Sequence, residues 1–119
     1  MSIAARRGAK LRNVRPLVIV DAENVRRSGW PNLSRPELLE RSRRWAEREG
    51  LDVLVDFDGE PPERAADVAG APNADDEIAR VAGATERTFW LVTSDRELRE
   101  RAGGRAARSI GGGTFLGMI

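Results

Sequence analysis

The sequence predicts a single α/β domain in which helices cover both faces of a mainly parallel sheet of about four strands. Two observations predict this three-layer fold class. Short apolar runs without polar alternation recur along the chain, as expected of strands that are buried on both faces. Segments with helical periodicity and capping signals lie between these runs. Strands and helices therefore alternate, which is typical of a parallel sheet with right-handed crossovers.

Four strands are predicted from the apolar runs. Residues 17–20 are apolar throughout, rich in β-branched side chains and too few for a helix. Residues 51–57 and 88–93 are equally apolar in their central parts. A weaker run at 106–110 is closed by three glycines. Residues 59–72 contain too much Pro, Gly and Ala for one regular element, so we expect a mobile loop or a short helix there.

The longest predicted helix lies between the first two strands. Ser34 and Glu37 form a capping box at its start, and Gly50 ends it because glycine tolerates the left-handed conformation found after helices. One face of this helix carries Leu38, Ser42, Trp45 and Ala46. Trp45, on this face, and Trp90, in the third strand, are therefore expected in the core.

Two shorter helices are predicted after the second and third strands. Asn73 can cap a helix that runs through Ile78 and Val81. Ser94 and Glu97 form a second capping box, which opens a helix through residues 98–102.

The residue inventory excludes most catalytic chemistries. The 119 residues include no His, no Cys and no Tyr, and the single lysine is Lys10. The chain therefore has no thiolate nucleophile, no imidazole base and no Cys or His ligand for zinc. Carboxylates, hydroxyls and guanidinium groups remain. An enzyme of this composition works through Asp and Glu, and we expect a metal ion that they hold.

Net charge divides the chain into two parts. Residues 1–15 carry five basic side chains and no acid, whereas residues 16–119 carry 15 basic and 19 acidic side chains. We expect residues 1–15 to form a basic, disordered tail and residues 16–119 to form the domain. Such a tail can contact nucleic acid phosphates, but it can equally be a solvated leader or a transit peptide. No apolar run is long enough to span a membrane or act as a secretory signal, so we expect a cytoplasmic protein.

Acidic residues follow three of the predicted strands. Asp21 follows the first strand, Asp56 and Asp58 end the second, and Asp95 follows the third. The carboxyl ends of parallel strands line one crevice, so these acids should meet there. Asp75 and its neighbour Asp76 begin the intervening helix and can face the same crevice.

These carboxylates allow two interpretations. Asp75, Asp76 and Asp95 lie at predicted helix starts, where a negative charge is favourable with the helix dipole without any functional role. A charge directly after a buried strand, as at Asp21, is costly unless it is solvated, hydrogen-bonded or coordinated. A divalent ion would relieve the repulsion among gathered acids, and all-oxygen ligands fit Mg²⁺ or Mn²⁺. Such an ion supports phosphodiester hydrolysis because it polarises a phosphoryl oxygen and lowers the pKa of bound water.

Four ordered motifs resemble one family. The stretches LVIVDAENVRRSGW, VDFDG, ADDEIARVAG and LVTSDRELRERAGG resemble the motifs of NYN domains, in the YacP-like branch of the PIN-like nucleases, over residues 16–117. The resemblance implies a PIN-like (Rossmann-like) fold, a metal-dependent ribonuclease, Mg²⁺ or Mn²⁺ as cofactor and RNA as partner. It also implies a C-terminal helix, here reduced to residues 114–119, and a possible homodimer.

The resemblance also implies roles for individual residues. Asp21, Asp75 and Asp95 would be the catalytic, metal-holding core, with Asp58 and Asp76 as supporting ligands. Thr93 and Ser94 would orient Asp95 or touch a phosphate, and Asn24, in the first motif, would help to bind the substrate. On this hypothesis the substrate-binding residues also include Arg26 and Arg27, which can meet phosphates, and Trp30 can stack on a base. Solvated arginines and a core tryptophan are the alternatives for those three positions.

Two other functions stay open at the level of sequence. The segment VLVDFDGE also resembles the nucleophile motif of haloacid-dehalogenase-type phosphatases, with Asp56 as nucleophile and Asp58 as acid. That family requires a later lysine and a later acidic pair, which this chain lacks. The other alternative is a non-catalytic RNA-binding or assembly module, because fold does not determine function.

Overall fold

The computed structural model describes residues 14–119. Most of the predicted basic tail, residues 1–13, lies outside this part of the chain. Five parallel strands form one sheet in the order β3-β2-β1-β4-β5. Their bounds are β1 Leu17–Asp21, β2 Asp52–Asp58, β3 Val68–Ala71, β4 Phe89–Val92 and β5 Arg108–Ile110. The order reverses between β1 and β4, and this is the point at which open α/β sheets bind ligands.

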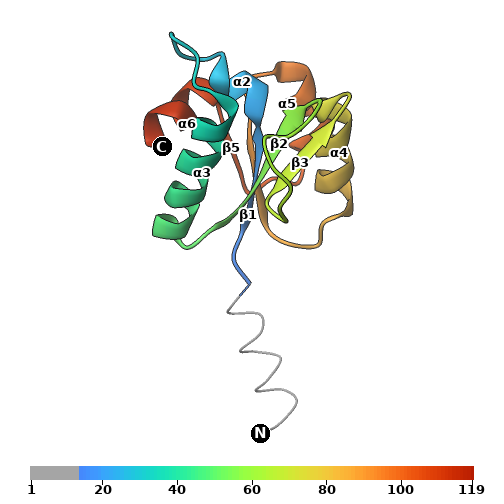
Figure 1. The fold of residues 1–119 in the computed structure, drawn as a ribbon. Helices are drawn as coiled ribbons and strands as arrows, with labels where there is room; N and C mark the ends of the chain where they lie inside the picture. Colours follow the sequence, from blue (N-terminus) through green and yellow to red (C-terminus); the bar gives the residue numbers. More distant parts are fainter. Residues whose placement is uncertain (1–13) are drawn as a thin grey trace, which may run out of the picture.

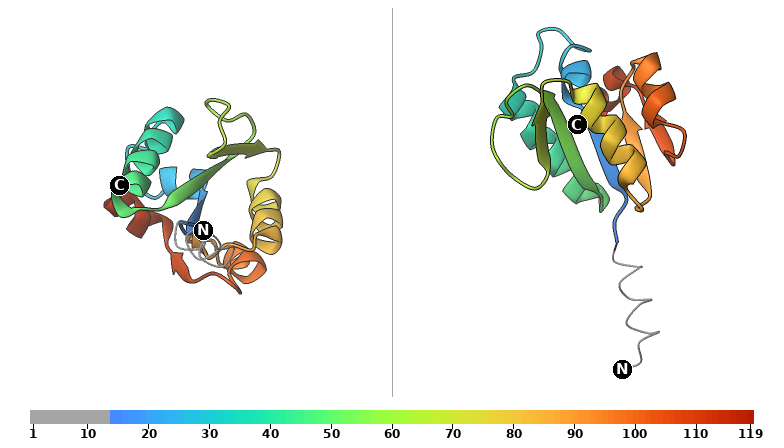
Figure 2. Two further views of the ribbon diagram at one scale, coloured as in Figure 1. Left: turned by 90° about the horizontal axis from the view of Figure 1, so that it is seen from below. Right: turned by 90° about the vertical axis from the view of Figure 1, so that its right-hand side faces the viewer.

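Helices cover both faces of the sheet (Figures 1 and 2). One face carries α2 (Ala22–Arg26), α3 (Arg35–Glu49) and α6 (Gly112–Met118), and the other carries α4 (Ala74–Ala84) and α5 (Arg96–Ala102). The larger core lies under α3, where Trp45 packs edge-on against Phe115 with ring centroids 5.0 Å apart. The smaller core contains Ile19 and Leu91 beneath α4 and α5. The fold is thus the predicted three-layer α/β sandwich, with a fully parallel sheet.

The alternation of side chains along each strand decides which face the polar residues take. Val53, Val55 and Phe57 belong to the core under α3. Successive strand residues point to opposite faces, so Asp56 and Asp58 lie on the face that α4 and α5 cover. The same rule places Asp21 on the face of Ile19 and places Thr93 on the face of Leu91.

The sheet has five strands where about four were predicted, and the prediction of a mobile loop or a short helix at 59–72 was wrong. This segment contains β3, an edge strand that pairs with β2 from Val55↔Val68 to Asp58↔Ala71. Its sequence, VAGA, lacks the apolar run of a central strand because it pairs on one side only. Gly70 is required there because a Cβ would collide with the Gly59 carbonyl and the Pro61 ring.

Helix boundaries agree with the predictions in two cases and differ in two. Ser34 caps α3 by accepting a hydrogen bond from the Glu37 N–H at 3.2 Å, and Gly50 ends that helix with φ 69°. Asn73 caps α4 as predicted. Asp95 rather than Ser94 caps α5, and the last helix begins at Gly112 rather than at residue 114. The short helix α2 was not predicted, because its single turn carries no periodic pattern.

Trp45 is buried as expected, whereas Trp90 is only partly buried. The guanidinium carbon of Arg108 lies over the Trp90 ring, 4.7 Å from the ring centroid. Within residues 14–119 no helix is long and apolar enough to cross a membrane.

Candidate functional site

Asp21 and Asp95 are joined through the hydroxyl of Thr93. Thr93 Oγ1 donates a hydrogen bond to Asp21 Oδ2 at 2.8 Å and accepts one from the Asp95 backbone N–H at 3.1 Å. Thr93 is fully buried, and Asp21 is 6% exposed. The hydroxyl has one proton to give, so it faces Asp21 as a donor and leaves its lone pairs for the Asp95 amide. The end of β1 and the turn after β4 therefore have a fixed relative position.

Asn24 and Ser94 connect the backbone around this pair. Asn24 Oδ1 accepts a hydrogen bond from the Ser94 N–H at 2.9 Å, and Ser94 Oγ accepts one from the Gly112 N–H at 2.8 Å. A Cβ on Gly112 would collide with Asn24 Oδ1, so glycine is needed where α6 begins. Both side chains hold α2, α5 and α6 together, and a phosphate contact by either one stays a prediction.

The N-terminus of α4 is fastened to the end of β2. Asn73 Oδ1 accepts hydrogen bonds from the N–H groups of Asp75 and Asp76 at 3.0 and 3.4 Å. Asp58 Oδ1 accepts one from the Ala74 N–H at 2.9 Å. The charges of Asp95 and Asp58 act on Asp75, whereas Asp76 pairs with Arg101 on α5 at 2.9 Å.

Asp56 is a site residue that the sequence analysis did not place among the candidate ligands. Its Cα pairs in register with that of Asp21, and both side chains lie on the α4 face. Asp56 is 0% exposed, and neither carboxylate oxygen has a hydrogen-bond partner within residues 14–119. The period-2 pattern of Asp52, Leu54, Asp56 and Asp58 was the available signal. We call Asp21, Asp56, Asp58, Asp75 and Asp95 the acidic edge.

Burial and mutual repulsion raise the pKa values of Asp21, Asp56 and Asp75. The pKa of Asp21 rises to about 6, chiefly through burial, with the Thr93 hydrogen bond opposing and the charge of Asp75 adding to the rise. The pKa of Asp56 rises to about 7 through burial and then through the charges of Glu77 and Asp21. Burial and the charges of Asp95 and Asp58 also raise the pKa of Asp75. In the described chain no member of the acidic edge forms an ion pair.

The donor set of the acidic edge fits a hard divalent cation in an open site. All available donors are oxygens, and the two oxygens of Asp56 are buried without a partner. Among residues 14–119 no three acidic side chains are close enough, as they stand, to hold an ion. Mg²⁺ does not require three, because it commonly keeps several waters and binds through one or two carboxylates and the phosphates of a substrate.

The predicted phosphate- and base-binding residues lie in and after α2. Arg26 is occupied within the protein, because its guanidinium pairs with Glu23 and donates to the Leu33 carbonyl at 2.8 Å. Arg27 is exposed, with a guanidinium nitrogen 4.0 Å from Glu23. Trp30 is 92% exposed and therefore does not belong to the core. Base stacking by Trp30 and phosphate binding by the arginines stay predictions.

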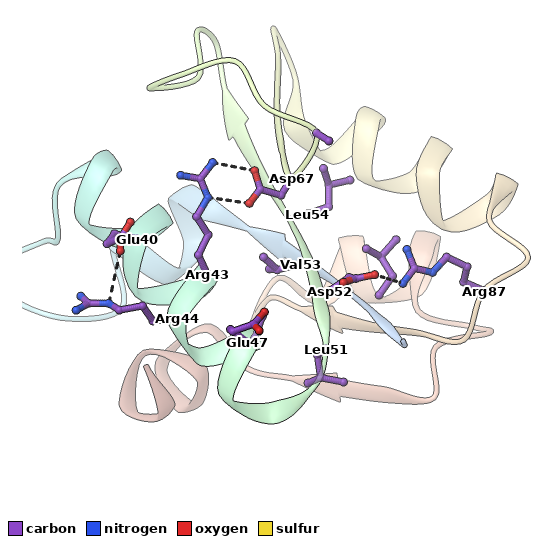
Figure 3. Close-up of a pocket in the computed structure, with 13 residues that line it drawn as sticks. Glu40, Arg43, Arg44, Glu47, Leu51, Asp52, Val53, Leu54, Asp67 and Arg87 are labelled. Atoms are coloured by element: carbon purple, nitrogen blue, oxygen red, sulfur yellow. Dashed lines mark hydrogen bonds and ion pairs between the residues drawn. The ribbon is translucent and has the colours of Figure 1, made fainter. Parts of the chain in front are cut away.

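A large pocket lies away from the acidic edge. It has a volume of about 750 Å³ and lies beside α3 and the first residues of β1 and β2 (Figure 3). Its arginines are already paired: Arg43 binds both carboxylate oxygens of Asp67 at 2.7 and 2.8 Å, and Arg87 binds Asp52 at 2.6 Å. We call this region the paired pocket.

Comparisons with known proteins identify the fold. No family model matches the chain, and no curated protein matches it in sequence. Among solved structures the chain is similar to Rae1 (YacP) from Bacillus subtilis, determined as a W164L mutant. The two chains superpose with a TM-score of 0.69 and are 21% identical, over 85% of this chain and 72% of the other. The domain therefore has a YacP-like, PIN-like fold.

Proposed function

We propose that this protein is a metal-dependent ribonuclease of the NYN type. The observation that carries the proposal is the acidic edge itself, where one hydroxyl binds both Asp21 and the Asp95 N–H, and where no arginine of residues 14–119 forms an ion pair with these acids. The YacP-like fold and the four motifs support the assignment. They also make RNA the proposed substrate. The sheet carries these acids at its C-terminal edge, where α/β folds bind ligands.

The cofactor on this proposal is Mg²⁺ or Mn²⁺, held by Asp21, Asp75 and Asp95 with Asp58 in support. When bound, such an ion supplies Lewis-acid polarisation of a phosphoryl oxygen. Thr93 orients the carboxylate of Asp21, and the Asn24 and Ser94 hydrogen bonds keep the loops at fixed positions. Asp76 can bind the ion only if its ion pair with Arg101 breaks. Arg27 and Trp30, both exposed, are available to bind the RNA backbone and a base.

The burial of Asp56 disfavours the phosphatase alternative. A nucleophilic carboxylate must reach the substrate phosphorus, yet Asp56 has no exposed surface. Its strand, β2, is also the second in the chain rather than the first.

Cleavage of a labelled single-stranded RNA in Mn²⁺ or Mg²⁺ tests the proposal. We expect Asp21→Asn and Asp95→Asn to lower the cleavage rate more than about 100-fold, the upper end of losses from second-shell changes at metal sites. Both substitutions preserve local structure, because Asn accepts from Thr93 as Asp21 does and is an equally good N-cap at position 95. EDTA should stop cleavage by the wild-type protein.

Asp52→Asn is the matched control, since it removes a carboxylate from the opposite end of the sheet, where Asp52 pairs with Arg87. Its cleavage rate should equal that of the wild type. Equal cleavage by wild-type, Asp21→Asn and Asp95→Asn proteins would refute the ribonuclease. RNA binding without cleavage, unaffected by Asp21→Asn, would identify the non-catalytic RNA-binding module instead.

A further inference from the structure

Asp21 and Asp56 are the two buried members of the acidic edge, and within residues 14–119 only Asp56 of these two lacks a hydrogen-bond partner. Asp21 has the Thr93 hydroxyl, Asp58 the Ala74 N–H and Asp95 the Leu98 N–H. Both oxygens of Asp56 lack any partner in the described part of the chain, and the residue is completely buried. A buried charge without a partner is strongly unfavourable, so this carboxyl group either keeps its proton or is neutralised by a cation that residues 14–119 do not supply.

No nearby side chain can take this role without losing its own partner. Arg80 on α4 is the cation whose charge acts on Asp56. Its guanidinium is bound to both carboxylate oxygens of Glu77, at 2.6 and 3.0 Å. The remaining charges around Asp56 are those of Glu77, Asp21 and Asp58, and all of them are negative. The environment of Asp56 therefore attracts a cation from outside the protein.

The register places Asp56 beside Asp21. Their strands are neighbours and parallel, and the two residues are paired across them. Neighbouring strands lie about 4.8 Å apart, and both side chains lie on the α4 face. Two short carboxylates at this separation can bind the same small ion through bonds of about 2.1 Å.

We propose that Asp56 is a direct ligand of the divalent cation, which it binds jointly with Asp21. This inference rests on the proposed metal-dependent function and adds Asp56 to the ligands named in that proposal. An oxygen of Asp56 can bind the ion while remaining shielded from solvent, because the ion contacts water and substrate on its other side. The inner ligands would then come from two adjacent strands, with Asp58, Asp75 and Asp95 around them.

Mn²⁺ binding by the metal-free protein, measured by titration calorimetry, tests the assignment without reference to activity. We expect Asp56→Asn and Asp56→Val to weaken Mn²⁺ binding by at least about tenfold. Val is β-branched and suits a buried strand, so it serves if the Asn variant does not fold. Asp52→Asn, on the same strand, should bind Mn²⁺ as the wild type does.

Thermal unfolding gives a second readout. In EDTA the Asp56→Val protein should unfold at a higher temperature than the wild type, because an uncompensated buried acid has been removed. In saturating Mn²⁺ the order should reverse, because the ion stabilises the folded state by an amount that grows with the logarithm of the ratio of its concentration to Kd, and the variant has the higher Kd. A residue with only a structural role would keep the same order in both conditions.

The outcomes separate this inference from the proposed function. If Asp21→Asn loses Mn²⁺ binding while both Asp56 variants bind as tightly as the wild type, Asp56 is not a ligand and the ribonuclease proposal stands. If the wild type binds Mn²⁺ through Asp21 and Asp56 but cleaves no RNA, the proposed function fails and the ligand assignment holds. A wild-type protein that binds no Mn²⁺ would overturn both.

Discussion

At the N-terminal ends of β1 and β2 each acid of the paired pocket faces an arginine, whereas at the C-terminal ends of the same strands Asp21 and Asp56 face other acids. Strand β2 contains both situations, with Asp52 bound to Arg87 at its start and Asp56 without a partner near its end. The chain has 20 basic and 19 acidic side chains, so arginine is not in short supply. Within residues 14–119 arginines pair with other acids and none forms an ion pair with the acidic edge, an arrangement that the proposed cation site would use.

The two regions also differ in the direction of their pKa shifts. The pKa of Asp67 in the paired pocket is lowered, mainly by its hydrogen bonds with Arg43. The pKa values of Asp21 and Asp56 are raised, mainly by burial. Charge on Asp67 thus stabilises the fold, and charge on Asp56 destabilises it. The dependence of unfolding free energy on pH, measured for variants of Asp56 and of Asp67, tests this difference between the two regions.

The largest effect on stability is expected from pH at the acidic edge. Metal-free wild type and Asp56→Asn are compared by urea unfolding across the pH range. Unfolded Asp releases its proton near pH 3.9, whereas folded Asp56 keeps it until about pH 7. Between these values the folded state holds more protons than the unfolded state, so stability falls as pH rises.

The two proteins should be about equally stable below pH 4, where Asp56 is neutral in both folded and unfolded states. Above pH 7 the variant should be more stable by a few kcal/mol at most. Asp52→Asn provides the comparison, since its carboxylate is paired with Arg87 and should not show this stabilisation. If the difference in unfolding free energy between wild type and Asp56→Asn stays constant with pH, the charge of Asp56 does not destabilise the folded protein.

The next largest effect is expected at Thr93, which joins Asp21 to Asp95. Thr93→Val keeps the shape but removes the donor to Asp21 and the acceptor for the Asp95 N–H. We expect a loss of about 1–3 kcal/mol in unfolding free energy, because two buried polar groups lose their partner. RNA cleavage should fall as well, since Asp21 is no longer oriented.

Thr93→Ser is the matched variant because it keeps the hydroxyl and loses only a methyl group. It should retain cleavage and lose about 1 kcal/mol. Equal behaviour of the Val and Ser variants would contradict a role for the hydroxyl at the acidic edge.

The sequence predicts most of this site because strand ends are visible in it. Apolar runs located β1, β2 and β4, and the acids after those runs therefore fell on one edge. Asp56 was missed as a ligand because a continuous apolar run was interpreted as buried on both faces, which conceals the alternation that directs Asp56 to the α4 side. Only the register of β1 with β2 places it beside Asp21.

Contacts between distant segments set the remaining features, which no local pattern encodes. Strand β3 exists because Val68–Ala71 pairs with β2, and its composition alone resembles a loop. Arg26 resembles a phosphate ligand in sequence, yet its guanidinium is bound to Glu23 and to the carbonyl of Leu33. Asn24 matched a motif position, and only the fold reveals its hydrogen bond with Ser94, 70 residues away.

The smallest effect on unfolding free energy is expected in the paired pocket. The contribution of Asp67 to stability should grow as pH rises, whereas that of Asp56 should fall. Asp67→Asn removes a two-point ion pair with Arg43 that fastens α3 to the residue before β3. We expect a loss of about 1–2 kcal/mol at pH 7, the range of charge-assisted hydrogen bonds. The folded pKa of Asp67 is depressed, so its stabilisation is complete above the unfolded pKa near 3.9 and is lost as pH falls through the folded value.

Urea unfolding of wild type and Asp67→Asn at pH 7 and in strong acid measures this effect. The two proteins should differ at pH 7 and converge in acid, whereas wild type and Asp56→Asn converge in acid with the variant more stable at neutral pH. Glu63→Gln, which removes the outer and more exposed partner of Arg43, should cost less than about 1 kcal/mol. If Asp67→Asn were instead stabilising at pH 7, acids would be unfavourable in both regions, and the contrast that assigns a cation to the acidic edge would be lost.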